Sequence, residues 1–250
     1  MGGGEIGQVK GNTNVNIAHA NTKVGTVYGG GKGDDADHEI AQVDGFCTVS
    51  ISDGQVGYMK QVPVIGGGTT DQFVGGYAYG GGMYASVTHD TRVELTGGTV
   101  KCDATEDEGG DVFGGGQGNN TNVNNDLGRV MGCSYVEISA PAWIERNVYG
   151  GGQLAQVEQN SNVTMTGGKV GTIDYDKVGG STVYNKVVHT SGGRLFGGGK
   201  GSTNDADQAR VKGNSNVTLS GGIVYDNVYG GGGVASVGLR TVTHLNPEDP

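Results

Sequence analysis

Residues 211–224, which read VKGNSNVTLSGGIV, show most clearly the pattern on which the predicted fold rests. Within it Ser215, Val217 and Leu219 alternate with polar residues, and this two-residue period is typical of a strand with one buried face. A Gly-Gly pair then interrupts the strand, and a second strand begins at Val224. The stretch therefore predicts two short strands joined by a glycine corner.

The same frame recurs along the chain. Two valines lie six positions apart, an aliphatic residue or Met follows two positions later, and an aromatic residue with three glycines closes each copy. The Val pairs are Val9/Val15, Val43/Val49, Val87/Val93, Val130/Val136, Val157/Val163 and Val211/Val217, with a weaker seventh copy at Val237/Thr243. The aromatic residues are Tyr28, Tyr79, Phe113, Tyr149, Phe196 and Tyr229. Fixed spacing inside the copies and variable spacing between them indicates stacked repeats, each of which buries its apolar side against its neighbours.

A third short strand is predicted to end at Val228-Tyr229, just before the Gly triplet. Three short strands per copy predict an all-β fold, namely a right-handed parallel β-helix (β-solenoid) of about seven three-strand coils. No segment combines a helical apolar period with caps, so we expect nearly no helix. Antiparallel hairpins are the less favoured alternative, because the chain lacks Asn-Gly turns. We expect residues 1–250 to form a single repeat domain. We also expect it to be a segment of a longer protein, because Met1 stands where the frame places an aromatic residue.

Equivalent positions of successive copies should lie above one another. The position two residues before each second Val carries a hydroxyl in most copies, and it should face inward and donate hydrogen bonds. This row is Thr13, Cys47, Thr91, Ser134, Ser161, Ser215 and Thr241. Cys47 is therefore predicted to be buried and structural. We interpret the aromatic row as packing rather than as a sugar-binding strip, because it follows the frame and not the variable loops.

Composition limits the function. The chain has 53 Gly among 250 residues, and its hydrophobic fraction is only 34%, which predicts a thin core. The formal net charge of −10 disfavours nucleic acid and anionic membranes as partners, since both require a basic surface. The chain has no apolar run long enough to span a bilayer, and its odd number of cysteines at unrelated spacings predicts neither a disulfide framework nor a zinc site.

Every second copy carries a longer polar loop between its Gly triplet and its first Val, at residues 32–39, 119–126 and 200–207. Variable loops on a rigid scaffold are where binding usually occurs. The candidate residues for binding a partner or glycan are Asp34, Asp35, Asp37, Asn122, Asp126, Asn204, Asp205 and Asp207. Longer insertions at residues 57–78, 101–111 and 171–193 are further variable segments.

Two chemistries are weighed for these loops. Alternating carboxylates suit calcium, and Asp35, Asp37, Asp205 and Asp207 are its weak candidates, but no full calcium-loop pattern surrounds them. Ordinary solvated loop charge is the favoured interpretation, with no cofactor. The pair Asp34-Asp35 also resembles half of a glycoside-hydrolase site. No catalytic set recurs on neighbouring copies, so we predict no catalytic residues and no enzyme activity.

The pattern Val-x-Gly-Asn-Ser/Thr-x-Val-x-aliphatic-x-Gly-Gly-x-Val, closed by Val-Tyr-Gly-Gly-Gly, resembles the glycine-rich β-helical repeats of bacterial cell-surface and secreted proteins, including adhesin-like and autotransporter-passenger-like chains. It is found at residues 9–31, 157–170 and 211–232. The resemblance implies a secreted or cell-surface bacterial protein that serves as a stalk and display scaffold for adhesion to host or glycan surfaces. The alternatives are a polysaccharide-active hydrolase or lyase fragment, and a structural spacer that self-associates end to end.

Overall fold

The computed structural model describes residues 1–103, 106, 108–119, 126–178, 181–188, 192–203, 205 and 207–238, with side chains omitted for the strands of residues 173–178 and 181–188. The described chain is all-β and contains no helix, which confirms that part of the prediction. The strands are β1 Thr13–Ile17, β2 Lys23–Val24, β3 Thr26–Tyr28, β4 Cys47–Ile51, β5 Gln55–Val56, β6 Tyr58–Pro63, β7 Thr69–Val74, β8 Tyr77–Tyr79, β9 Thr91–Leu95, β10 Thr99–Val100, β11 Cys102–Asp103, β12 Glu108–Gly109, β13 Asp111–Phe113, β14 Ser134–Ile138, β15 Trp143–Ile144, β16 Val148–Tyr149, β17 Ser161–Val170, β18 Ile173–Val178, β19 Ser181–Val188, β20 Leu195–Phe196, β21 Ser215–Val224 and β22 Val228–Tyr229.

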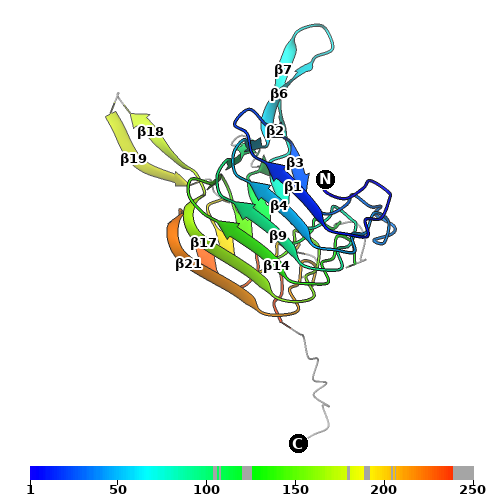
Figure 1. Cartoon of the computed structure of the whole chain (residues 1–250). Helices are drawn as coiled ribbons and strands as arrows, with labels where there is room; N and C mark the ends of the chain where they lie inside the picture. Colours follow the sequence, from blue (N-terminus) through cyan, green and yellow to red (C-terminus); the bar gives the residue numbers. More distant parts are fainter. Residues whose placement is uncertain are drawn as a thin grey trace, which may run out of the picture.

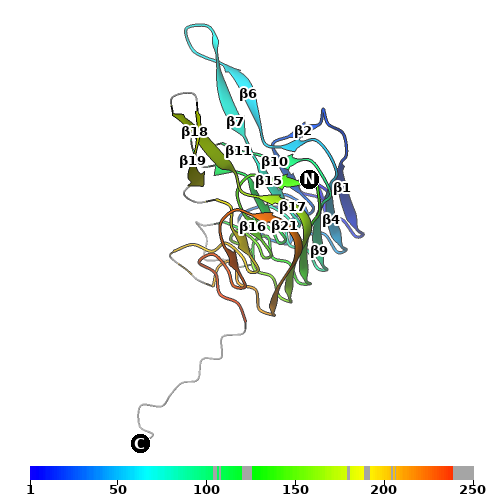
Figure 2. The ribbon, with the colours of Figure 1, turned by 90° about the vertical axis from the view of Figure 1, so that its left-hand side faces the viewer.

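The largest sheet has ten strands and is parallel throughout. Its path runs β1-β4-β9-β14-β17-β15-β10-β5-β2, and β21 pairs with β17 beside this path. Equivalent frame positions pair directly, as Val49 does with Val93 and Val93 with Val136. Figures 1 and 2 show the sheet curling round on itself. The repeat frame of the sequence thus fixes the strand register.

The predicted right-handed β-helix of about seven three-strand coils is wrong. The first and second strands of the copies do not form two separate walls, because β17 pairs with both β14 and β15 and joins them in one curled half-barrel sheet. Strands β17 and β21 also run for ten residues through their Gly-Gly pairs, so these glycines bend a strand instead of ending it. The first strand occurs in six copies, and the seventh copy lies largely outside the described residues.

A second parallel sheet of six strands, β22-β20-β16-β13-β8-β3, closes the core. Its inward residues Val112 and Val148 pack in one cluster with the inward residues of the curled sheet, such as Val93 and Ile138. The predicted inward orientation of the second valine of each pair is confirmed for Val49, Val93, Val136 and Val163, which are all buried. The core therefore lies between the two sheets.

The aromatic row lies on the other side of this second sheet. Its six rings stack with neighbouring centroids 4.9 Å apart and nearly parallel planes. The rings of the first five are buried, which confirms a packing role. Residues after the Gly triplets cover the stack, since the Tyr28 hydroxyl donates to Gln117 and the Tyr79 hydroxyl donates to Gln153. Burial raises the pKa of Tyr28, Tyr79 and Tyr149 above its ordinary value.

Buried hydroxyls form hydrogen bonds to the glycine triplets, and the triplets of neighbouring copies approach each other closely. The hydroxyls of Thr91, Ser134 and Ser161 are buried, and each donates a 2.6 Å hydrogen bond to the carbonyl of the first glycine of the following triplet. A Cβ at Gly114 would lie 2.2 Å from the carbonyl oxygen of Gly150. The triplets are therefore required by close approach of neighbouring copies.

A buried carboxylate ties three copies together. The side chain of Asp111 is fully buried, and its Oδ1 accepts hydrogen bonds of 3.1 Å from both the backbone and the side-chain amide of Asn147. Its Oδ2 lies 3.1 Å from Lys200 Nζ and 3.7 Å from Arg146 Nη1. Because a buried charge is tolerated only when it is paired, this cluster is a point of structural sensitivity.

The three long insertions contain antiparallel hairpins rather than irregular loops. Strands β6 and β7, β11 and β12, and β18 and β19 each form a separate two-stranded sheet. Figures 1 and 2 show the β6–β7 and β18–β19 hairpins projecting from the body of the molecule. The sequences that connect these strands lack Asn-Gly, the dipeptide that most strongly predicts a hairpin, so the sequence alone did not indicate them.

Candidate functional site

The candidate site lies on the outer face of the curled sheet. Strands β4, β9, β14 and β17 turn the second Val of each copy inward, so the residues immediately before and after that Val face outward. In-register pairing places one row of outward side chains side by side: Ser50, Glu94, Glu137 and Thr164. A carboxylate pair thus stands at the centre of a polar face.

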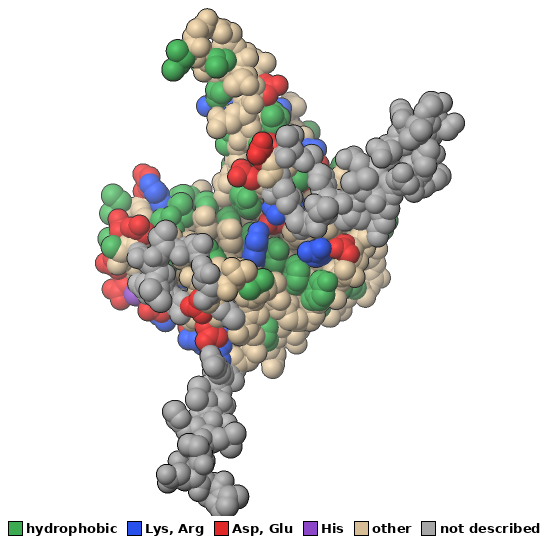
Figure 3. All heavy atoms as spheres, turned by 180° about the vertical axis from the view of Figure 1, so that it is seen from behind, with side chains coloured by type: hydrophobic (Ala, Val, Ile, Leu, Met, Phe, Trp, Pro, Cys, Tyr) green, Lys and Arg blue, Asp and Glu red, His purple; other side chains and the backbone are tan. Residues whose placement is uncertain are grey.

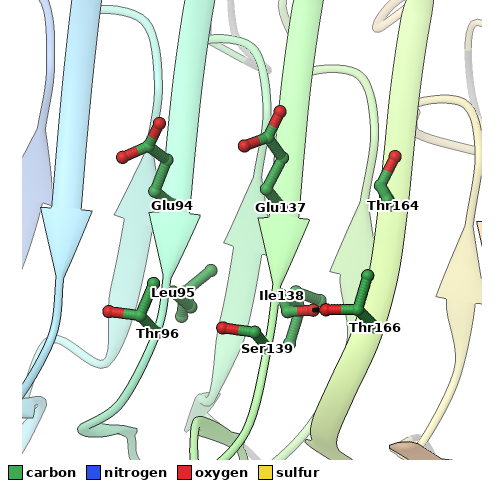
Figure 4. A pocket seen from close by; sticks show the side chains of 8 residues that line it. All are labelled: Glu94, Leu95, Thr96, Glu137, Ile138, Ser139, Thr164 and Thr166. Carbon is green, nitrogen blue, oxygen red and sulfur yellow. Dashed lines mark hydrogen bonds between the residues drawn. The ribbon is translucent and has the colours of Figure 1, made fainter. Parts of the chain in front are cut away.

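A groove of about 360 Å³ lies against this row (Figure 4). We call it the carboxylate groove; its lining residues are Glu94, Leu95, Thr96, Glu137, Ile138, Ser139, Thr164 and Thr166. Figure 4 shows the two carboxylates side by side on neighbouring strands, with the hydroxyls of Thr96, Ser139 and Thr166 in a second row. The groove therefore offers carboxylate acceptors and hydroxyl groups that both donate and accept.

Arg92 orders the carboxylates. Its Nη1 lies 2.8 Å from Glu137 Oε1 and 3.4 Å from Glu94 Oε1. The Ser50 hydroxyl donates to Glu94 Oε2 at 3.3 Å, and the Arg92 guanidinium lies 5.2 Å from the centre of the Tyr135 ring. The side chains of Glu94 and Glu137 are 37% and 42% exposed, so they are held in place and still reach solvent.

A second hollow of about 260 Å³ adjoins on the same face. We call it the aromatic hollow; it is lined by Phe46, Cys47, Thr48, Asp90, Thr91, Arg92 and Tyr135. Phe46 is 47% exposed, and its ring packs at 5.1 Å against His89. Because Arg92 lines this hollow and also contacts both carboxylates of the groove, the two form one track along β9 and β14, which we call the β9–β14 face.

The β9–β14 face has the chemistry of a recognition site for a polyhydroxylated ligand. The exposed Phe46 ring offers a flat apolar surface, and carboxylates accept strong hydrogen bonds from hydroxyl donors. The two carboxylates have similar exposure and share one cation. Acid–base catalysis on a glycoside needs two carboxyl groups in contrasting environments, which this pair does not have.

The loop aspartates predicted from the sequence lie elsewhere, in the column of loops that follows the Gly triplets. Asp34, Asp35 and Asp37 are exposed. Asp34 Oδ1 accepts a hydrogen bond from the backbone amide of Ala36, and Asp37 Oδ1 accepts one from Glu39, so both carboxylates stabilise turns. The structure does not bring these residues to the β9–β14 face.

The aspartates of the two later loops also contact residues close to them in the chain. Asp205 Oδ1 accepts a hydrogen bond from the Asp207 amide at 2.8 Å. Asp126 forms an ion pair of 2.7 Å with Arg129, and Asp207 lies 3.8 Å from Arg210. Asn122 and Asn204 lie outside the described residues. Within the described ranges, no group of three or more His, Cys, Asp or Glu side chains could hold a metal ion, and calcium stays the less favoured alternative for these loops.

Sequence reasoning missed Arg92, Glu94, Tyr135 and Glu137. A signal was present, because Glu94 and Glu137 each follow the second Val of their copy and the frame aligns them. The frame predicts which residues face inward, but it does not distinguish a binding residue from a solvated polar group among those that face outward.

No family model matches the chain, and searches of curated proteins and of solved structures give no significant match. The described part of the chain also holds no helix with the length and apolarity that crossing a bilayer requires.

Proposed function

We propose that this chain is a non-enzymatic display scaffold of a secreted or cell-surface bacterial protein, and that its β9–β14 face binds glycans. Its resemblance to glycine-rich surface repeats supports the location. The observation that carries the binding function is the position of Arg92, which lines the aromatic hollow and contacts both carboxylates of the carboxylate groove.

The scaffold suits an extended ligand. Neighbouring strands of a sheet lie about 4.8 Å apart, so in-register pairing repeats polar groups at a regular short interval across the face. Rigid backing also lowers the entropy lost on binding, because the outward side chains stand on strands whose opposite faces are buried. A linear oligosaccharide presents hydroxyl groups and apolar ring faces in alternation, which this arrangement complements.

The test is binding to a glycan array, followed by calorimetric titration of the glycans retained. We expect Glu137→Gln and Tyr135→Ala to weaken binding by at least about tenfold, which corresponds to about 1.4 kcal/mol. Asp34→Asn and Asp37→Asn are matched controls, since they alter exposed carboxylates on the distant loops. Thermal unfolding of each variant verifies that the fold is kept.

Three outcomes would contradict the proposal. One is the absence of glycan binding, and another is binding that the loop variants abolish and the face variants leave intact. The third is release of reducing ends or unsaturated sugars that Glu137→Gln prevents, which would favour the polysaccharide-active alternative.

End-to-end self-association is a second candidate function, favoured by the C-terminal edge. Leu219, Val228 and Tyr229 are 44%, 42% and 42% exposed, and a Cβ at Gly230 or Gly231 meets nothing within 4 Å. Exposed strand edges with apolar side chains promote pairing with another chain. Sedimentation over a concentration range tests this. Assembly that Gly231→Glu abolishes would support it, and a monomer at every concentration would contradict it.

A further inference from the structure

The β6–β7 hairpin carries an apolar tip, which we define as residues 62–70. Ile65 is fully exposed and Val64 is 47% exposed. The hairpin pairs six residues on each side, from Tyr58 with Val74 to Pro63 with Thr69. At about 3.4 Å per residue, its strands carry the tip roughly 17 Å beyond the first pair.

The base of this hairpin is anchored. The Phe73 ring occupies the space that a side chain at Gly57, Gly76 or Gly109 would need, since Cβ atoms there would lie 2.8–3.0 Å from it. The Gly76 amide also donates a 2.7 Å hydrogen bond to the Gly25 carbonyl. A fixed base holds the tip away from the body of the molecule.

The tip has no charged side chain. Residues 62–70 read VPVIGGGTT, and the nearest charged residues along the hairpin are Lys60 and Asp71. Figure 3 shows the outer end of the hairpin in the colours of hydrophobic and uncharged groups, with charged side chains only nearer the body. The net charge of −10 thus lies outside the tip.

Some backbone N–H and C=O groups of the turn form hydrogen bonds with one another. The Val64 amide donates to the Gly68 carbonyl at 3.2 Å, and the Gly67 amide donates to the Val64 carbonyl at 3.1 Å. Gly66, Gly67 and Gly68 have φ values of +105°, +97° and +89°, and nothing lies within 4 Å of a Cβ at any of them. The glycines thus allow a tight turn with two internal hydrogen bonds. These bonds lower the free-energy cost of moving the backbone of the turn out of water.

We propose that this tip inserts into the surface of a zwitterionic phospholipid bilayer. Insertion favours apolar side chains, few unpaired backbone groups and no buried charge. The tip has exposed apolar side chains and no charge, and two hydrogen bonds within the turn pair part of its backbone. Lys60 lies where the strands would pass the lipid headgroups. A protein pocket is the less favoured partner, because energetically dominant interface residues are enriched in Trp, Tyr and Arg, and the tip has none. Anionic lipid is disfavoured by the net charge.

The test is co-sedimentation of the full chain with phosphatidylcholine vesicles. We expect Ile65→Asp to reduce the bound fraction by on the order of tenfold, because burial of an Ile side chain is removed and a charge is added. Ile6→Asp is the matched control, since Ile6 is 76% exposed but lies outside the hairpin. Both substitutions alter exposed side chains, so unfolding midpoints should match that of the unsubstituted chain.

A second readout reports the tip itself. In Ile65→Trp, vesicles should shift the indole emission to shorter wavelength relative to the unsubstituted chain, whose one Trp is Trp143 on β15. The proposal would be overturned by a lack of sedimentation of the unsubstituted chain or by equal binding of Ile65→Asp. Binding to protein-containing native membranes, with none to vesicles of their extracted lipids, would also overturn it and assign the tip to a protein partner.

Discussion

The hydroxyl of Ser134 donates a 2.6 Å hydrogen bond to the carbonyl of Gly150, which lies 16 residues further along the chain. The same bond links Thr13 to Gly29, Thr91 to Gly114, Ser161 to Gly197 and Ser215 to Gly230. It joins the first strand of a copy, in the curled sheet, to the glycine triplet that follows the second sheet. A hydroxyl in five of the six described copies, buried in four of them, therefore fastens the two sheets together.

Cys47 occupies this position in the second copy, where it is buried and burial raises the pKa of its thiol to about 11. A thiol is a weaker donor than a hydroxyl. We therefore expect Cys47→Ser to raise the free energy of unfolding by about 1 kcal/mol. Denaturant titration measures it, and Ser134→Ala should lower stability by a similar amount. Equal or lower stability of Cys47→Ser would contradict a fastening role for the row.

The glycine triplets should differ in tolerance according to their neighbours. At Gly114 an added Cβ would lie 2.2 Å from the Gly150 carbonyl oxygen, whereas at Gly230 it meets nothing within 4 Å. We expect Gly114→Ala to destabilise the protein by about 1–3 kcal/mol, as overpacking does. Gly230→Ala should leave the unfolding midpoint nearly unchanged. Similar losses in both variants would show that backbone flexibility, and not close approach, selects glycine.

Asp111 should be sensitive to loss of its charge. Asp111→Asn leaves Arg146 and Lys200 facing a neutral group in a largely buried cluster, and we expect a loss of about 3 kcal/mol. Adding Lys200→Met should recover part of this loss, because one unpaired cation is then removed. A double-mutant cycle by chemical denaturation measures the coupling. Additive losses would mean that the two side chains do not interact.

The buried tyrosines predict loss of stability in alkali. Tyr28, Tyr79 and Tyr149 have pKa values raised above 10.0 by burial, so the folded state favours the neutral phenol. Their contribution is complete below the ordinary pKa near 10 and is lost as pH rises from there toward the folded pKa values. Denaturant titrations at increasing pH should show this fall, with tyrosinate absorbance rising on unfolding.

Tyr149→Phe is the informative variant for this effect. Phe113 and Phe196 occupy the same row, so the ring stack should be kept. The free energy of unfolding of Tyr149→Phe should decline less steeply above pH 10 than that of the unsubstituted chain. An identical decline would exclude Tyr149 as a source of the alkaline sensitivity.

Much of the local structure could be predicted. The alternation around Val217 and its counterparts correctly gave strands, inward valines and the absence of helix in the described chain. The buried aromatic row and the hydroxyl row also followed from spacing alone. The topology did not, because a Gly-Gly pair such as Gly167-Gly168 can end a strand or bend it. The structure shows bending within β17.

The candidate site was predicted poorly for a related reason. Loop aspartates such as Asp34 and Asp37 cluster in sequence, and this clustering predicted a binding loop. In the structure their carboxylates stabilise local turns. Arg92, Glu94 and Glu137 form their cluster only when β9 and β14 pair. Phe46 joins the face from the segment before β4.

The sequence by itself determined which side of each strand is buried, because side-chain direction alternates along a strand whatever the strand pairs with. Tertiary structure alone decided how the strands join into sheets, where the hairpins project and which outward side chains meet. Those outcomes depend on contacts between residues far apart in the chain, and a two-residue period carries no information about them.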